Sequence, residues 1–202
     1  MFQAPFFRPA AIGGALVCGA LLAACDGSDA AVAPEDAMLA HSHSGSSPAI
    51  LHRQLAELRQ ATARFHNFEA AQDAGYTILF DPDGAGPGSA CLSNPTQGAM
   101  GEHYVDPALL FDGGALDIAH PEALIYEPMQ NGKPRLVAVE YVIPFSDLPM
   151  TAEPPVLFGQ QFMPNNNPGF QLWALHAWVW KNNPSGMFAA WNPNVTCEFS
   201  AN

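Results

Sequence analysis

Apolar residues between positions 48 and 74 recur every three or four residues, which is the spacing of one face of an α-helix. Gly75 follows where a glycine often ends a helix, because glycine adopts a left-handed backbone conformation without strain. The sequence therefore predicts one long helix from Pro48 to Ala74. Its apolar stripe consists of Leu51, Leu55, Leu58, Thr62 and Phe65.

Beyond Gly75 the pattern changes to short runs of aromatic and β-branched residues bounded by Gly, Pro, Asn or Asp, which is typical of β-strands. Asn131-Gly132 lies between the third and fourth runs and is a strong hairpin signal. We therefore expect an α+β fold, an antiparallel β-sheet or partly closed barrel with one long N-terminal helix packed on it. The predicted strands are 76–80, 102–105, 123–127, 135–145 and 171–180.

Two segments rich in Pro, Gly and Asn interrupt the predicted strands, at 81–100 and 146–170. Loops of this length without regular structure usually have a function or are held in place by another part of the chain. We expect both to be irregular.

The first 24 residues have the layout of a secretory signal peptide: Arg8 precedes an uncharged apolar segment, and the first acidic residue is Asp26. The apolar segment is shorter than the ~20 residues that span a bilayer, so export is favoured over a permanent transmembrane helix. The sequence Leu22-Ala23-Ala24-Cys25 resembles the lipobox of bacterial lipoproteins. That resemblance implies lipid on Cys25 and attachment to the bacterial cell envelope, facing the periplasm or exterior; the alternative is ordinary cleavage near the same alanines.

These features divide the chain into a signal peptide at 1–24, a lipid-anchored flexible tether at 25–48 and one globular α+β domain at 49–202. Cys18 would leave with the signal peptide and Cys25 would carry lipid. Cys91 and Cys197 then remain in an oxidising compartment, where we expect them to form a disulfide. Thiolate ligation of a metal is less favoured, since the chain has no Cys-x-x-Cys pair and neither cysteine lies in a strand-like run.

The chain carries 19 acidic residues against seven Lys and Arg, for a formal net charge of −12. Nucleic-acid binding needs clustered cations, so we expect no nucleic-acid partner. The lipid on Cys25 makes the membrane the expected partner, and the sequence identifies no small-molecule or protein partner.

Strand alternation places ligand-type side chains on otherwise apolar faces. Glu140 shares a face with Leu136, Ala138 and Val142, and His176 shares one with Leu172, Ala174, Trp178 and Trp180. An isolated carboxylate in an apolar interior is costly, so it must be protonated, paired or bound to a metal. The basic residues lie on the helix, in turns or at strand edges. The predicted metal ligands are His103, His176, Glu140 and Glu127 on strands, with His66 and Glu69 on the helix.

Two or three His with one or two Glu suit one divalent transition metal: Zn, Fe, Mn or Cu. Each residue also has a structural alternative. His176 can be a core histidine bonded to a backbone carbonyl, and Glu140 can pair with Arg135 or a tyrosine. Glu127 can point to solvent at a strand end. Glu102, Glu122 and the loop residue His120 are expected to be solvent-exposed.

Motifs for other chemistries are absent from the sequence: Gly-x-Ser-x-Gly, the P-loop, Gly-x-Gly-x-x-Gly, His-Glu-x-x-His and Cys-x-x-Cys-His. The segment 62–197 contains FHNFEAAQDAGY, HPEALIYEP and LHAWVWKNNPSGMFAAWNP, and it resembles a group of exported bacterial proteins of unknown function. It is also similar to cupin-like metal proteins in placing His and Glu on antiparallel strands, although the cupin His-x-His spacing is missing.

Two functional hypotheses follow. The first is a cell-envelope lipoprotein with a His/Glu transition-metal site. If that protein is an enzyme, we expect chemistry at metal-activated water or oxygen, with a carboxylate as general base. The second is a non-catalytic envelope binding or assembly module in which the His and Glu residues are polar groups of the core. In that module a tryptophan cluster forms a core or partner surface: Trp173, Trp178, Trp180 and Trp191.

Overall fold

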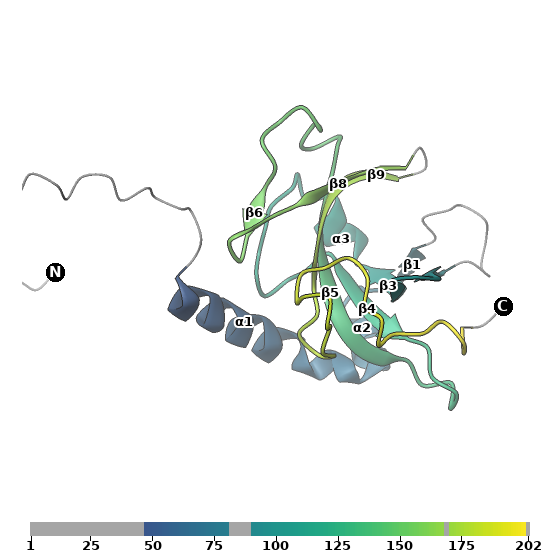
Figure 1. Ribbon diagram of the computed structural model, residues 1–202. Coiled ribbons are helices and arrows are strands. Elements are labelled where there is room, and N and C mark those ends of the chain that lie inside the picture. Colours follow the sequence, from purple (N-terminus) through teal and green to yellow (C-terminus); the bar gives the residue numbers. More distant parts are fainter. Residues whose placement is uncertain (1–46, 81–89, 168–169, 201–202) are drawn as a thin grey trace, which may run out of the picture. The chain divides into compact units, whose positions relative to one another are not determined.

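The computed structural model describes residues 47–80, 90–167 and 170–200. It shows an α+β fold built on a strongly curled antiparallel sheet that forms a half-barrel (Figure 1). The predicted signal peptide, Cys25 and nearly all of the predicted tether lie outside the described residues. No helix in the described ranges is long and apolar enough to cross a membrane.

The predicted helix at Pro48–Ala74 forms, but as three pieces instead of one. The pieces are α1 (Pro48–Thr62), the 3₁₀ helix η1 (Ala63–His66) and α2 (Phe68–Asp73). The break occurs because Asn67 adopts an extended backbone, and its side chain accepts a hydrogen bond from the Glu69 amide to cap α2. Gly75 follows α2 with φ +112°, which agrees with its predicted role as the helix-ending glycine.

The main sheet has seven strands, and its path runs β1-β3-β4-β5-β9-β8. β2 pairs with the same edge of β3 as β1 does, but at the N-terminal part of that strand, whereas β1 pairs with its C-terminal part. A separate two-stranded sheet joins β6 and β7, and α3 (Pro107–Leu110) follows β3. The strands are β1 (Ile78–Phe80), β2 (Cys91–Asn94), β3 (Gly98–Val105), β4 (Ala123–Glu127), β5 (Arg135–Pro144), β6 (Val156–Leu157), β7 (Gln160–Gln161), β8 (Met163–Asn167) and β9 (Phe170–Ala177).

All five predicted strands are confirmed as β1, β3, β4, β5 and β9; β4 has the predicted ends, and the other four are shifted at one end or both. The turn at Asn131-Gly132 joins β4 to β5, and Gly132 has φ +71°, as the predicted hairpin requires. The prediction of irregular loops at 81–100 and 146–170 is wrong in part, because the first contains β2 and the second contains β6, β7 and β8.

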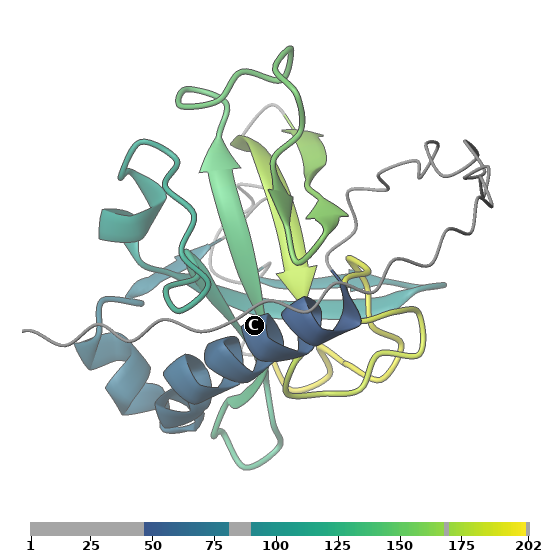
Figure 2. The ribbon, with the colours of Figure 1, turned by 90° about the vertical axis from the view of Figure 1, so that its left-hand side faces the viewer.

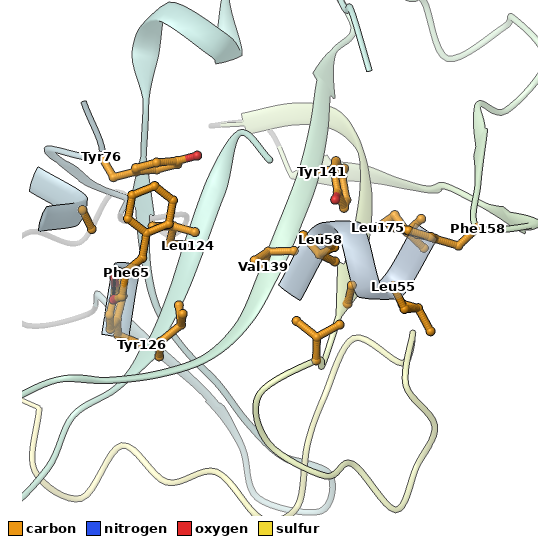
Figure 3. Close-up of a cluster of buried hydrophobic side chains, with 14 of the residues drawn as sticks. Leu55, Leu58, Phe65, Tyr76, Leu124, Tyr126, Val139, Tyr141, Phe158 and Leu175 are labelled. Atoms are coloured by element: carbon orange, nitrogen blue, oxygen red, sulfur yellow. Dashed lines mark hydrogen bonds between the residues drawn. The ribbon is translucent and has the colours of Figure 1, made fainter. Parts of the chain in front are cut away.

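The largest apolar cluster lies between the helices and one face of the sheet. Figure 2 shows α1 in front of the strands, and Figure 3 shows Leu55 and Leu58 of α1 near Val139, Tyr141 and Leu175 of the sheet. Leu55, Leu58, Thr62 and Phe65 are buried, so the predicted apolar stripe is confirmed over most of its length. This face is called the helix face below, and the other the open face.

Alternation along β5 is interrupted by a bulge. Ile125 pairs with Ala138 and Tyr126 with Leu136, which leaves Val137 as an extra residue. The prediction that Leu136 shares a face with Glu140 is therefore wrong, since Leu136 packs in the helix-face core. Beyond the bulge, Val139 and Tyr141 face the helices, and Glu140, which lies between them, faces the opposite way.

The predicted disulfide between Cys91 and Cys197 is present, with their Cα atoms 5.7 Å apart. It joins β2 to the C-terminal segment across 106 positions of sequence. Contrary to expectation, Cys91 belongs to strand β2. The sequence did not predict this strand because its four residues, Cys-Leu-Ser-Asn, lack the composition that is typical of β-strands.

Candidate metal centre

Three of the predicted ligands meet on the open face. His103 comes from β3, Glu140 from β5 and His176 from β9. Glu140 and His176 are direct partners across the β5–β9 pair, so their side chains leave the sheet on the same face. One ligand atom of each residue lies within 4.8 Å of those of the other two.

The carboxylate of Glu140 faces both imidazoles. Its Oε2 lies 3.6 Å from Nε2 of His103, and its Oε1 lies 3.5 Å from Nε2 of His176. Both separations exceed the usual length of a hydrogen bond between nitrogen and oxygen. In the described part of the chain, Glu140 forms no ion pair with Arg135 and no hydrogen bond with a tyrosine.

His103 reaches the other two ligands across β4, which lies between β3 and β5 in the sheet. On the open face of β4 the intervening residues are Ala123, which pairs with Glu140, and Ile125, which pairs with His103. Because Ala123 has only a methyl side chain, it leaves the space above β4 to the ligand side chains.

The two imidazoles are buried, at 2 % exposure for His103 and 6 % for His176. Among the described residues, Nδ1 of His103 and Nε2 of His176 have no hydrogen-bond partner. Buried polar atoms are rarely left unsatisfied, so each such atom calls for an explanation. The ring of His176 also stacks on Trp178 with an interplanar angle of 12°, which fixes its orientation.

Burial sets the protonation of the cluster. It lowers the pKa of His103 to about 4, an effect only partly opposed by the Gly101 backbone, and the pKa of His176 to about 3, helped by the nearby His103. Burial also raises the pKa of Glu140 to about 8, with a further contribution from the charge of Glu122. At neutral pH the imidazoles are therefore neutral, which is the form that ligates metals.

The three side chains line a cavity of about 700 Å³. Its other walls come from β1, β2, β3, β7, β8, β9 and the segment 188–191. Sequence patterns placed Leu172 and Ala174 on the face of His176, but they did not predict the contact between Phe80 of β1 and Phe170 of β9, because that contact depends on the curl of the sheet.

Glu127 does not join the group. It is 3 % exposed, and both of its carboxylate oxygens accept hydrogen bonds from Nζ of Lys181, at 2.7 and 2.6 Å. The amide of Thr196 donates to the same carboxylate at 3.2 Å. Lys181, one of the basic residues that we placed in turns or at strand edges, thus does supply a partner to a buried acid. The alternative of an exposed Glu127 is wrong.

His66 and Glu69 also lie outside the group, and both are exposed. The helix break at Asn67 changes the direction of the residues that follow, so the projection of an unbroken helix does not hold. The ring of His66 packs edge-on against Trp180, 4.5 Å between centroids. Trp180 itself lies on the helix side and donates to Thr62, so its predicted place on the face of His176 is wrong.

Two glutamates expected at the surface are buried instead. Glu122 is 1 % exposed and accepts a hydrogen bond from the Val142 amide at 2.9 Å. Burial raises its pKa to about 8. Glu102 is 9 % exposed and accepts a hydrogen bond from Ser200 at 2.8 Å. His120, in contrast, is an exposed loop residue as predicted, and it contacts Asp117.

Comparison of this chain with protein-family models, curated proteins and solved structures found no match. The chemistry of the site therefore has to be argued from its own residues.

Proposed function

We propose that this protein binds one divalent transition metal through His103, Glu140 and His176, and that it does so as a lipoprotein of the bacterial cell envelope. The convergence of the three side chains from separate strands on one cavity carries the metal proposal. No other His, Asp or Glu in the described ranges completes such a group.

The distances from Glu140 to the two imidazoles are compatible with an ion held between them. Two ligand atoms about 2.1 Å from a tetrahedral metal lie roughly 3.4 Å from each other. The two separations between Glu140 and the imidazoles, 3.5 and 3.6 Å, are close to that value. A bound ion would also satisfy the unpaired Nε2 of His176 and neutralise the carboxylate.

Two His and one carboxylate suit Zn(II), Fe(II), Mn(II) or Cu(II), and they leave coordination positions free. The cavity beside the three ligands gives an exogenous molecule access to those positions. Chemistry at metal-activated water or oxygen is therefore compatible with the site. Among the described residues that line the cavity, Glu140 is the only acidic one, so they supply no second carboxylate as a general base.

The envelope part of the proposal rests on the signal-like segment 1–24 and the lipobox-like Leu22-Ala23-Ala24-Cys25. The disulfide between Cys91 and Cys197 is compatible with an oxidising compartment. Mass spectrometry of the membrane fraction tests it: lipid attached to an N-terminal Cys25, and lost in Cys25→Ala, is expected. An unmodified chain in the soluble fraction would contradict the anchor.

Elemental analysis of the untagged protein tests the metal site. We expect about one transition metal per chain in the wild type and a loss of bound metal in His176→Ala. His120→Ala is the matched control, because His120 is exposed in a loop and should not affect the metal content. A protein that takes up no metal from any of the four ions would refute the proposal.

The non-catalytic module remains the competing proposal. The ion pair with Lys181 supports it in the case of Glu127, which acts as a polar group of the core. One buried glutamate of the predicted set is thus neutralised within the protein, with no ion required. The predicted tryptophan cluster does not support the module, because Trp173 belongs to the helix-face core while Trp178 packs on the open face. Absence of metal uptake would leave this module as the better account.

A further inference from the structure

We propose that the cavity beside the metal binds a small apolar molecule with a single anionic oxygen donor, such as an aromatic carboxylate, and that this oxygen ligates the metal. This inference rests on the proposed binding of a metal by His103, Glu140 and His176. It adds the chemical class of the molecule that occupies the free coordination positions.

The cavity walls are largely apolar. Phe80 and Phe170 contact each other with ring centroids 4.0 Å apart, although their strands are not neighbours in the sheet. Met100, Leu172 and Trp191 continue the apolar surface toward the ligands. Apolar and aromatic walls around a few polar groups are characteristic of sites for small organic molecules.

The charges in the cavity limit its occupant to one negative charge. Among the described residues, Glu140 is the only one with a carboxylate that lines the cavity, and no Lys or Arg does so. A divalent ion with one carboxylate ligand and two neutral imidazoles carries a net charge of +1. One anionic oxygen neutralises that charge, whereas a phosphate dianion would bring charge into an apolar site with no cation to match it.

Apart from the three ligands, the polar lining residues among those described are neutral: Ser93 and the amides of Gln and Asn side chains on β7 and β8. Gln161, Asn165 and Asn166 lie on β7 and β8, and two of them are exposed in the described structure. They can hydrogen-bond to water or to a neutral polar group of the ligand. They offer no full positive charge, so the metal is the only strong site for an anion in this cavity.

The size of the cavity also fits an organic molecule better than a simple inorganic anion. Its volume of about 700 Å³ falls within the range of small-molecule sites, roughly 300 to 1,000 Å³. A water molecule or acetate at the metal would leave most of the apolar wall uncovered. A ligand with an aromatic body would cover it, and its burial would strengthen binding.

Titration of the Co²⁺-loaded full chain tests the proposal, because the visible absorption of Co²⁺ changes when a new oxygen ligand binds. Phenylacetate, acetate and inorganic phosphate are the probes. We expect phenylacetate to bind at least about tenfold more tightly than acetate, since its ring is buried against the cavity wall. Phosphate should bind more weakly than phenylacetate.

Phe170→Ser should weaken phenylacetate binding several-fold while Co²⁺ content and acetate binding stay unchanged. Phe111→Ser is the matched control, because Phe111 is 69 % exposed and does not line the cavity. Equal affinities for phenylacetate and acetate on a Co²⁺-loaded protein would overturn this inference and leave the metal site intact. Failure to take up Co²⁺ or any other of the metals would overturn both proposals.

Discussion

Glu127, which is buried, and Glu140, which is partly buried, are glutamates on neighbouring strands, and their surroundings give them different roles. Glu127 accepts two short hydrogen bonds from Lys181, so its charge is matched within the protein. Glu140 has only the two neutral imidazoles nearby, and burial raises its pKa to about 8. The difference follows from the reach of one lysine and is not visible in the strand patterns of the two residues.

Glu127→Ala should lower the free energy of unfolding by roughly 3 kcal/mol, because it leaves a partly buried Lys181 without its partner. Its metal content should equal that of the wild type, since Glu127 is not one of the three grouped ligands. Urea unfolding and elemental analysis measure the two effects. Glu57→Ala, at an exposed position of α1, should change neither. Loss of metal in Glu127→Ala would show that our ligand assignment is incomplete.

Glu122 provides a test of stability against pH. Its folded-state pKa of about 8 lies above its ordinary value of 4.5, so the folded protein holds this proton more tightly than the unfolded chain. The stabilisation is fully present below about pH 4.5 and is lost as the pH rises through 8. The slope contributed by this one group is roughly 1.4 kcal/mol per pH unit between those limits.

Glu122→Gln should remove that slope and should be more stable than the wild type at pH 8. The glutamine keeps an oxygen that can accept the hydrogen bond from the Val142 amide, but it cannot ionise. Chemical unfolding with chelator present, at several pH values between 5 and 8, measures the difference between the two proteins. Parallel stability curves would show that Glu122 ionises as easily in the folded state as in the unfolded chain.

At the scale of elements, local patterns predicted those strands whose own composition favours β-structure. β4 and β5 are rich in branched and aromatic residues, whereas β8 has the sequence Met-Pro-Asn-Asn-Asn and forms because β9 pairs with it. The candidate ligands His103, Glu140 and His176 were predictable as polar interruptions of apolar faces. Their convergence was not, because it depends on which strands become neighbours and on the curl of the sheet.

β4 separates His103 on β3 from Glu140 on β5, and the small side chain of Ala123 on β4 leaves room for the two ligands to approach each other. Ala123→Val should reduce metal affinity at least about tenfold, because the added methyl groups occupy the space over β4 in a fully buried position. Competition with a coloured chelator measures the affinity. Ala99→Val, at a buried position of β3 four residues before His103, controls for overpacking alone, whose usual cost is about 1 to 3 kcal/mol. Equal affinities of the two variants would argue against this role of Ala123.

At the scale of the whole molecule, the disulfide between Cys91 and Cys197 closes a loop that contains most of the sheet and all three grouped ligands, His103, Glu140 and His176. Cys197 follows Thr196, whose amide donates to Glu127, and the same C-terminal segment supplies Trp191 to the cavity. In the chain-entropy model, a closed loop of this length stabilises the fold by about 4 to 5 kcal/mol relative to the open chain. The link therefore ties the stability of the site to an oxidising environment.

The double variant Cys91→Ser, Cys197→Ser should lose about 3 to 5 kcal/mol of unfolding free energy, and a reducing agent should lower the stability of the wild type by a similar amount. Thermal or urea unfolding, with and without reductant, measures both effects. The double variant is its own control, since reductant should have no further effect on it. At a metal concentration that keeps it folded, it should bind the same amount of metal as the wild type, because neither cysteine belongs to the grouped ligands. An unchanged stability in the double variant would mean that the disulfide does not constrain the unfolded chain enough to stabilise the fold.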